Sequence, residues 1–207
     1  MSKVYIVNAS QAYQMLFISI GYDLAWDLSQ ADLVCFTGGE DVSPRLYGAT
    51  KHPYTHSNFH RDEQEKLIYE ECVRLNIPMV GICRGGQFLN VMNGGEMYQH
   101  VEGHTRDHLI TDVLSLQTLL VSSTHHQMMK PSKKALIVAT SHLYRSREWY
   151  EGDEPRDDIS DLDIEVVWYE KTRSLCFQPH PEFDGVQYSN MRSYFNTLLK
   201  RFKLGVV

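Results

Sequence analysis

The segment Pro78 to Gln87 (PMVGICRGGQ) constrains the fold of this chain more than any other. Its first five residues form an apolar run typical of a buried central strand, and Gln87 to Met92 predict the body of a short helix. Cys83 therefore lies at the turn between a strand and a helix, with glycines at positions 81, 85 and 86. Small neighbours of this kind permit a nucleophile elbow, a sharp turn that presents a reactive side chain at the carboxyl end of a sheet.

Around this turn, short apolar runs alternate with longer amphipathic stretches. This alternation predicts an α/β fold with a mainly parallel central sheet flanked by helices. At 207 residues, the chain has the length of one domain covering 1–207. The clearest strands are predicted at 4–7, 31–36, 78–82, 135–139, 164–168 and 175–178.

Two longer helices are predicted from caps and apolar periodicity. The first is capped by Ser57 or Asn58 and ends before Pro78, and Tyr188 to Phe202 form the second. The predicted apolar stripe of the first helix contains Leu67, Ile68, Cys72 and Leu75, and that of the second contains Met191, Tyr194, Phe195, Leu198 and Leu199.

Tyr144 to Asp163 is an acidic stretch without a sustained period, and it predicts a long surface loop. Within it, Trp149 and Tyr150 are aromatic residues set among charges. We expect them to be exposed, so that the loop covers a site or docks a partner; the alternative is a solvated insert without such a role.

Composition and charge exclude several classes of function. A formal charge of −6 without a Lys/Arg cluster argues against a nucleic-acid groove, and no apolar run approaches the roughly 20 residues of a membrane helix. The start of the chain does not resemble a secretory signal, so we expect a cytoplasmic protein. The four cysteines form no CxxC pair, which argues against a zinc ribbon or a disulfide framework.

Ten histidines raise the question of a metal. His52, His56 and His60 recur at four-residue intervals, but Pro53 breaks any helix that would align the first two. The sequence therefore predicts no metal ligands, and no cofactor is expected.

Cys83 has the setting of a nucleophile, because a helix N-terminus stabilises a thiolate. Attack on an amide also needs a proton donor and a group that orients it. His180 and Glu182, in QPHPEF, suit these roles, since residues i and i+2 of an extended backbone project to the same side. Gly38-Gly39 follows a predicted strand, so we expect the N–H groups of Gly39 and Arg84 to form an oxyanion hole.

Together these features resemble the class I glutamine amidotransferases, and within them the branch that includes γ-glutamyl-γ-aminobutyrate hydrolase. Four stretches match in order: FTGGEDVSPRLYG (36–48), GICRGGQFLNVMNGGEMYQ (81–99), VSSTHHQ (121–127) and IEVVWYEKTRSLCFQPHPEF (164–183). The resemblance implies a flavodoxin-like class I glutamine amidotransferase fold.

The resemblance also implies residue roles. Cys83 would be the nucleophile, His180 the acid and base, and Glu182 its orienting partner, with Gly39 and Arg84 in the oxyanion hole. The glutamyl group would be held near Gly38 and by Gln87, Ser123, Thr124 and His125. One departure is Gly86, which replaces a larger residue and is expected to open space beside the elbow.

Three functions are compatible with these residues. In the first, Cys83 hydrolyses the γ-amide of glutamine through a thioester, and a separate synthetase accepts the ammonia, because the chain has no GxxxxGK[ST] motif of its own. In the second, the same triad cleaves a γ-glutamyl peptide or γ-glutamyl amine without a partner. The third is a non-catalytic binding protein on the same fold.

Overall fold

The computed structural model describes residues 1–141, 146, 149–152, 154–155 and 163–205. The helices are α1 (Gln11–Ser19), α2 (Phe59–Leu75), α3 (Arg84–Met92) and α4 (Ser189–Arg201). The strands are β1 (Lys3–Val7), β2 (Asp23–Ala25), β3 (Leu33–Phe36), β4 (Met79–Ile82), β5 (Glu96–Tyr98), β6 (His100–Val101), β7 (His108–Asp112), β8 (Thr118–Val121), β9 (Met128–Lys130), β10 (Leu136–Thr140), β11 (Trp149–Glu151), β12 (Glu154–Pro155), β13 (Ile164–Tyr169) and β14 (Ser174–Phe177).

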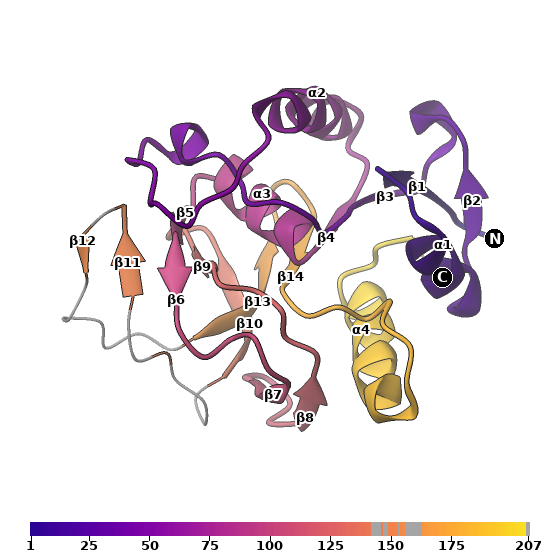
Figure 1. The fold of residues 1–207 in the computed structure, drawn as a ribbon. Helices are drawn as coiled ribbons and strands as arrows, with labels where there is room; N and C mark the ends of the chain where they lie inside the picture. The colour runs from indigo at the N-terminus through magenta and orange to yellow at the C-terminus, as the bar shows by residue number, and fades with distance from the viewer. Residues whose placement is uncertain (142–145, 147–148, 153, 156–162, 206–207) are drawn as a thin grey trace.

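The main sheet has the order β2-β1-β3-β4-β14-β13-β10-β7-β8 (Figure 1). Its first five strands are parallel, in the order found in flavodoxin-like folds, and the remaining four extend it by antiparallel pairing. The predicted α/β class is therefore confirmed.

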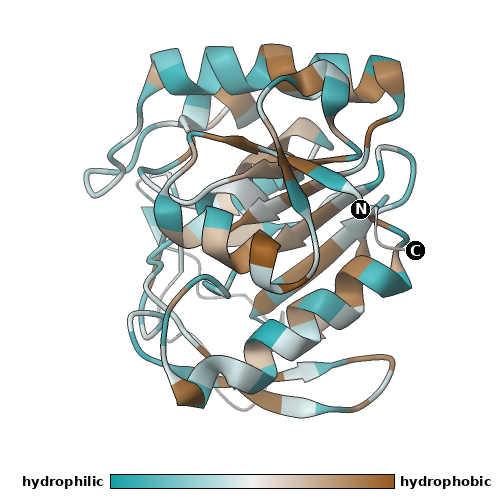
Figure 2. Ribbon diagram, turned by 90° about the vertical axis from the view of Figure 1, so that its right-hand side faces the viewer, coloured by the Kyte–Doolittle hydropathy of each residue, from teal (hydrophilic) through white to brown (hydrophobic). Residues whose placement is uncertain are grey.

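Helices cover both faces of the parallel strands. Along β3, Leu33 and Cys35 pack against α1 and α4, whereas Val34 and Phe36 pack against α2 and α3. Figure 2 shows mostly apolar strands between helices that carry polar residues outward. No helix in the described part of the chain has both the length and the apolar character needed to cross a bilayer.

The C-terminal helix is confirmed, because the buried residues of α4 are the five predicted from its spacing. The predicted stripe of α2 is partly wrong. Leu67 is 68% exposed and Leu75 is 43% exposed, while Asp62 and Glu65 are buried. The buried face of α2 is rotated toward these carboxylates because they form ion pairs with the buried Arg84.

The predicted surface loop at 144–163 is also partly wrong. Most of this segment lies outside the described residues, but β11 within it pairs with β6, placing Trp149 opposite Val101. Trp149 is only 6% exposed, and its ring lies edge-on to Tyr98 with centroids 4.8 Å apart. It is therefore an apolar core residue of the small sheet β12-β11-β6, and not an exposed anchor for a partner.

Candidate active site

The elbow at Cys83 is formed by close backbone contacts. Cys83 is the N-cap of α3 with a φ of 51°, a left-handed conformation that non-glycine residues rarely adopt outside strained sites. A Cβ at Gly85 would lie 2.0 Å from the Phe36 carbonyl oxygen, and one at Gly81 would lie 2.2 Å from the Gly85 backbone. Only glycine fits at these two positions, so α3 packs directly on the ends of β3 and β4.

Gly86 does not open space beside the elbow, contrary to the expectation from sequence. A Cβ at this position would lie 3.0 Å from the Phe177 nitrogen and 3.1 Å from the Gly81 oxygen. Gly86 therefore lets α3 approach β4 and β14, and it faces the sheet and not a substrate channel.

The structure brings Cys83, His180 and Glu182 together. Glu182 Oε1 lies 2.6 Å from His180 Nδ1, and the imidazole is hydrogen-bonded to the Cys83 thiol on its other side. His180 is anchored by its backbone N–H, which donates to Ser122 Oγ at 2.9 Å. The side chains of His180 and Glu182 are only 10% and 5% exposed, so water scarcely competes for these contacts.

The surroundings of His180 favour its protonated form. Burial alone lowers the pKa of the imidazole, but hydrogen bonds to Cys83 and Glu182 raise it, and the net result is a pKa of about 10. His180 is therefore an imidazolium at neutral pH. A cation of this kind stabilises a neighbouring thiolate and can donate a proton to a leaving amine.

The loop after β3 lies directly against these residues. A Cβ at Gly38 would lie 3.2 Å from His180 Cε1, and the Gly38 N–H donates to Tyr13 Oη at 2.9 Å. Burial and then the charge of Glu182 raise the pKa of Tyr13 well above its usual range. The neutral hydroxyl of Tyr13 therefore lies between the loop at Gly38 and the carboxylate of Glu182. No local sequence motif predicts this contact.

Arg61 holds the same loop from the opposite side. Its Nη2 donates to the carbonyl oxygens of Thr37 and Gly38 at 3.0 and 2.9 Å, which fixes the peptide that carries the Gly39 N–H. Gly39 has a φ of 142°, and a Cβ there would lie 2.1 Å from Arg61 Nη1. A side chain at Gly39 would therefore displace the guanidinium.

An ion-pair network continues from Arg61 to the elbow. Arg61 Nε lies 2.8 Å from Glu65 Oε1, and Glu65 and Asp62 both bind the guanidinium of Arg84. Burial lowers the pKa of Arg84 to about 10, so the side chain stays charged at neutral pH. Because Arg84 follows Cys83, the network ties the elbow through α2 to the loop at Gly39.

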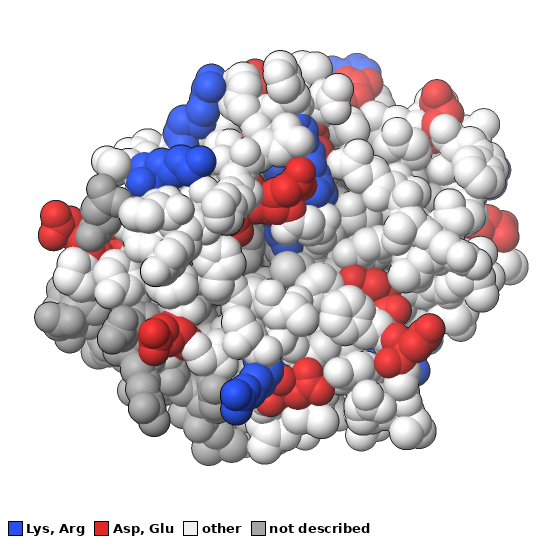
Figure 3. Space-filling model, viewed as in Figure 1, with Lys and Arg blue, Asp and Glu red and all other residues white. Residues whose placement is uncertain are grey.

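A cavity of about 270 Å³ opens beside Cys83. Six of the predicted residues line it: Cys83, Gly39, Arg84, Gln87, Thr124 and His125. Figure 3 shows a hollow near the centre of this face, bordered by adjacent basic and acidic side chains.

A larger hollow of about 1030 Å³ is lined by Asp32 and Pro78, which precede β3 and β4. It therefore lies at the opposite end of the parallel strands from Cys83, whereas ligands of such sheets bind at the carboxyl ends.

The predicted substrate residues differ in their surroundings. Ser123 turns its hydroxyl away from the cavity to donate to the His104 carbonyl oxygen. Gln87 is buried and donates through Nε2 to the Gln127 carbonyl oxygen at 3.3 Å and to Gln178 Oε1 at 3.2 Å. Gln178 Nε2 in turn lies 3.6 Å from Cys83 Sγ, a contact that sequence analysis missed although Gln178 directly precedes the PHPE motif.

His125 is held as a neutral ring. Burial is the largest effect on the imidazole, and it lowers the pKa to about 3. Its Nδ1 lies 2.8 Å from the Gln127 carbonyl oxygen, so Nδ1 carries the proton. His125 therefore presents an unprotonated Nε2 on its other edge.

The other cysteines lie in very different settings. Cys35, Cys72 and Cys176 are fully buried, and none of the four cysteines forms a disulfide. Burial raises the pKa of Cys72 to about 12, and it raises the pKa values of Cys35 and Cys176 further. These three thiols are therefore inert, whereas Cys83 is 8% exposed and faces the cavity.

Comparison with known proteins identifies the family. The model of the Peptidase C26 family matches residues 6–112. Protein NtpR of Enterococcus hirae is 30% identical over 201 residues, which cover 84% of this chain and 77% of NtpR. A candidate glutamine amidotransferase-like protein of Lactococcus lactis subsp. cremoris, the YvdE homolog, is 32% identical over 124 residues, or 50% of this chain and 66% of the relative.

A solved structure agrees with this at the level of the fold. A protein of Thermoplasma acidophilum described as a candidate GMP synthase subunit superimposes with a TM-score of 0.60 at 16% identity, covering 98% of this chain and 96% of that one. The fold is that of the class I glutamine amidotransferases. The chain therefore belongs to the Peptidase C26 family, within the class I glutamine amidotransferase superfamily.

Proposed function

We propose that this glutamine amidotransferase-type domain hydrolyses the γ-amide of glutamine through a γ-glutamyl thioester on Cys83. The observation that carries the proposal is the contact of Cys83 with a His180 imidazolium that Glu182 orients, beside a cavity lined by Gly39 and Arg84. The cavity, of about 270 Å³, suits an amino acid or a short γ-glutamyl compound. Glu40 and Asp41 line it and would attract an α-ammonium group.

Each step uses a group of this site. Cys83 Sγ attacks the γ-carbonyl carbon, and the resulting oxyanion accepts hydrogen bonds from the N–H groups of Gly39 and Arg84. His180 then transfers its proton to the amide nitrogen, which leaves as ammonia when the C–N bond breaks. The neutral imidazole next removes a proton from water as this water attacks the thioester, and glutamate leaves with the thiolate restored.

We further propose that a separate synthetase takes up the ammonia. The similar Thermoplasma protein is named as part of a synthase, and the likeness extends over 98% of this chain. In such an arrangement the isolated glutaminase turns over glutamine slowly, so weak activity alone agrees with the proposal.

The second candidate is a hydrolase of γ-glutamyl peptides or γ-glutamyl amines that acts without a partner. The name of the matching family, a peptidase, favours it. The room that Gly86 was expected to provide for a bulky amine is filled by the backbone of β4 and β14, which favours glutamine instead.

The test is to incubate the purified protein with glutamine and a panel of γ-glutamyl amines and peptides, and to measure glutamate and ammonia. We expect glutamine to yield both products in equal amounts, with none from Cys83→Ala above background. Cys72→Ala is the matched control, because Cys72 is buried away from the cavity and its removal should leave turnover intact.

Two outcomes would contradict the proposal. A much higher kcat/KM for γ-glutamyl amines or peptides than for glutamine would establish the second candidate. Binding of these compounds without turnover of any of them would indicate a non-catalytic binding protein.

A further inference from the structure

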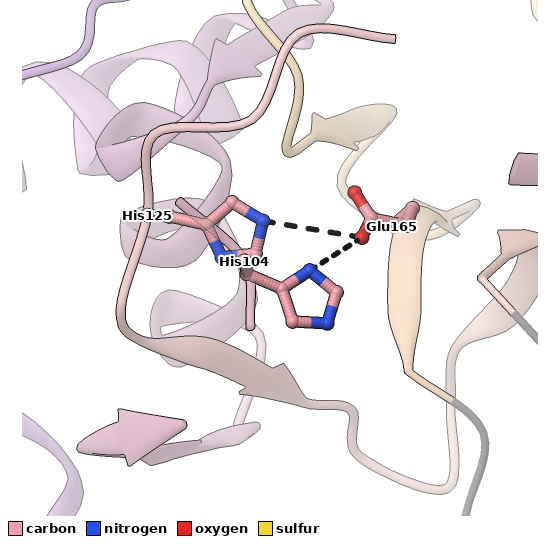
Figure 4. Close-up of side chains that lie close together, drawn as sticks. All are labelled: His104, His125 and Glu165. Carbon is pink, nitrogen blue, oxygen red and sulfur yellow. Dashed lines mark ion pairs between the residues drawn. The ribbon is translucent and has the colours of Figure 1, made fainter. Parts of the chain in front are cut away.

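A second group of chemically reactive side chains lies behind the wall of the cavity. His104 follows β6, His125 lies between β8 and β9, and Glu165 is on β13. All three are buried, with exposures of 0%, 4% and 0%. Within the described ranges, they are the one group of three or more His, Cys, Asp or Glu side chains placed so that they could hold a metal ion, with ligand atoms that all lie within 4.8 Å of one another (Figure 4).

The outer nitrogen of each ring is occupied by an acceptor. His104 Nε2 lies 2.8 Å from Asp163 Oδ2, and His125 Nδ1 lies 2.8 Å from the Gln127 carbonyl oxygen. The inner nitrogens face Glu165, whose Oε1 is 3.3 Å from His104 Nδ1 and 3.9 Å from His125 Nε2. Metal-bound histidines almost always donate their second N–H to a carboxylate or carbonyl in this way.

Among the described residues, the contact between His125 and Glu165 leaves buried polar atoms of both residues without hydrogen-bond partners. Because the Gln127 carbonyl oxygen can only accept, Nδ1 is the donor of the His125 ring, and Nε2 is the nitrogen that faces the buried carboxylate, 3.9 Å from Glu165 Oε1. Within the part of the chain that the structure describes, neither His125 Nε2 nor Glu165 Oε2 has a hydrogen-bond partner. Buried polar atoms without a partner are costly in a dry interior, and a cation between the ring and the carboxylate would satisfy both.

We propose that His104 Nδ1, His125 Nε2 and the carboxylate of Glu165 bind a zinc ion. Two imidazole nitrogens and one carboxylate oxygen form a donor set that zinc binds in proteins, whereas calcium and magnesium prefer oxygen ligands alone. His108 completes the surroundings, since its Nε2 lies 2.9 Å from Glu165 Oε1 and its Nδ1 lies 3.1 Å from the Arg106 carbonyl oxygen. It orients the carboxylate from outside.

The position of the ion defines its role. His125 also lines the cavity at Cys83, and its backbone N–H donates to the His104 carbonyl oxygen at 3.1 Å. The zinc ion joins this segment to β13 and so fixes the wall formed by Thr124 and His125. It is a structural ion behind the cavity and takes no part in the chemistry at Cys83.

The experiment measures metal binding directly and uses no activity assay, so its result is independent of the proposed function. The full chain is stripped with a chelator, checked for folding by circular dichroism and titrated with Co²⁺, whose d–d absorption reports a site of low coordination number. We expect one Co²⁺ per chain, displacement by Zn²⁺, and a higher Tm with Zn²⁺ present. Glu165→Gln should abolish the spectrum.

Two further variants complete the design. Asp163→Asn keeps the shape of the residue that orients His104, and it should weaken binding by about 10- to 100-fold. His56→Gln is the control for adventitious imidazole binding, because His56 is exposed and lies outside the group, and it should bind like the wild type.

Two results would contradict the proposed zinc site. A folded wild-type chain that binds neither Co²⁺ nor Zn²⁺ would overturn the proposal, and a bridging water or proton would then account for the contact. Binding that persists unchanged in both Glu165→Gln and Asp163→Asn would place the ion elsewhere. If Glu165→Gln does not fold, the affinity of Asp163→Asn decides alone.

Discussion

The buried ion pairs of Arg84 lead to a quantitative prediction for Arg84→Met. The side chain of Arg84 is 1% exposed, as is that of Glu65, and that of Asp62 is fully buried. Methionine fills similar volume but leaves Asp62 without its cation, whereas Glu65 keeps Arg61 at 2.8 Å. Removal of one partner from a buried pair costs about 3–5 kcal/mol.

The assay is urea unfolding followed by circular dichroism. With a urea dependence of about 2 kcal/mol per molar, the midpoint should fall by roughly 1.5–2.5 M. Adding Asp62→Asn to Arg84→Met removes the stranded charge and should restore part of the loss. The matched control is Arg74→Met, because Arg74 and Glu71 form an ion pair with side chains 66% and 38% exposed, and such pairs contribute less than about 1 kcal/mol.

The reasoning would be refuted by an Arg84→Met midpoint that shifts no more than that of Arg74→Met. It would equally be refuted if the double variant were less stable than Arg84→Met alone, because the stranded carboxylate would then not be the source of the loss.

Three other predictions address the site and the fold. Glu182→Gln removes one of the contacts that raise the His180 pKa to about 10. Because the protonated imidazole exists below that pKa and is lost above it, the alkaline limb of the kcat/KM profile should move to lower pH. An alkaline limb that does not move would contradict this role of Glu182. In Arg61→Lys, the lysine cannot bind two carbonyl oxygens as a fork, so kcat should fall roughly tenfold with little change in KM. This loss is smaller than the ~100- to 1,000-fold loss expected when an oxyanion donor itself is removed. An unchanged kcat would show that Arg61 does not position the Gly39 N–H. Trp149→Ala should lower the free energy of unfolding in urea by about 3 kcal/mol. The control is Trp26→Ala, because Trp26 is 79% exposed and its removal should change stability by less than about 0.5 kcal/mol. Equal effects of the two substitutions would show that Trp149 is not a core residue.

Sequence patterns predicted those parts of the molecule that depend on neighbours along the chain. The turn at Cys83, the pairing of His180 with Glu182 and the apolar stripe of α4 all follow from short-range spacing. The fold class follows for the same reason, because period and turn residues repeat along the sequence.

The features that were missed depend on contacts between distant segments. Leu67 was assigned to the buried face of α2 because periodicity cannot reveal that Arg84, 19 residues after Glu65, draws two carboxylates inward. The group of His104, His125 and Glu165 spans three separate segments, and no local spacing indicates it. The expectation for Gly86 was wrong because the atoms that fill its space belong to the backbones of two other segments, β4 and β14.

The central claim is that Cys83 alone among the cysteines acts as the nucleophile toward a γ-glutamyl group. Its most direct test is labelling with a chloromethyl ketone analogue of glutamine, followed by peptide mass spectrometry with and without excess glutamine. The account predicts one label per chain, on the peptide that contains Cys83, with protection by glutamine and no label on Cys35, Cys72 or Cys176. Labelling spread over all four cysteines, or labelling of Cys83 that glutamine does not slow, would contradict it.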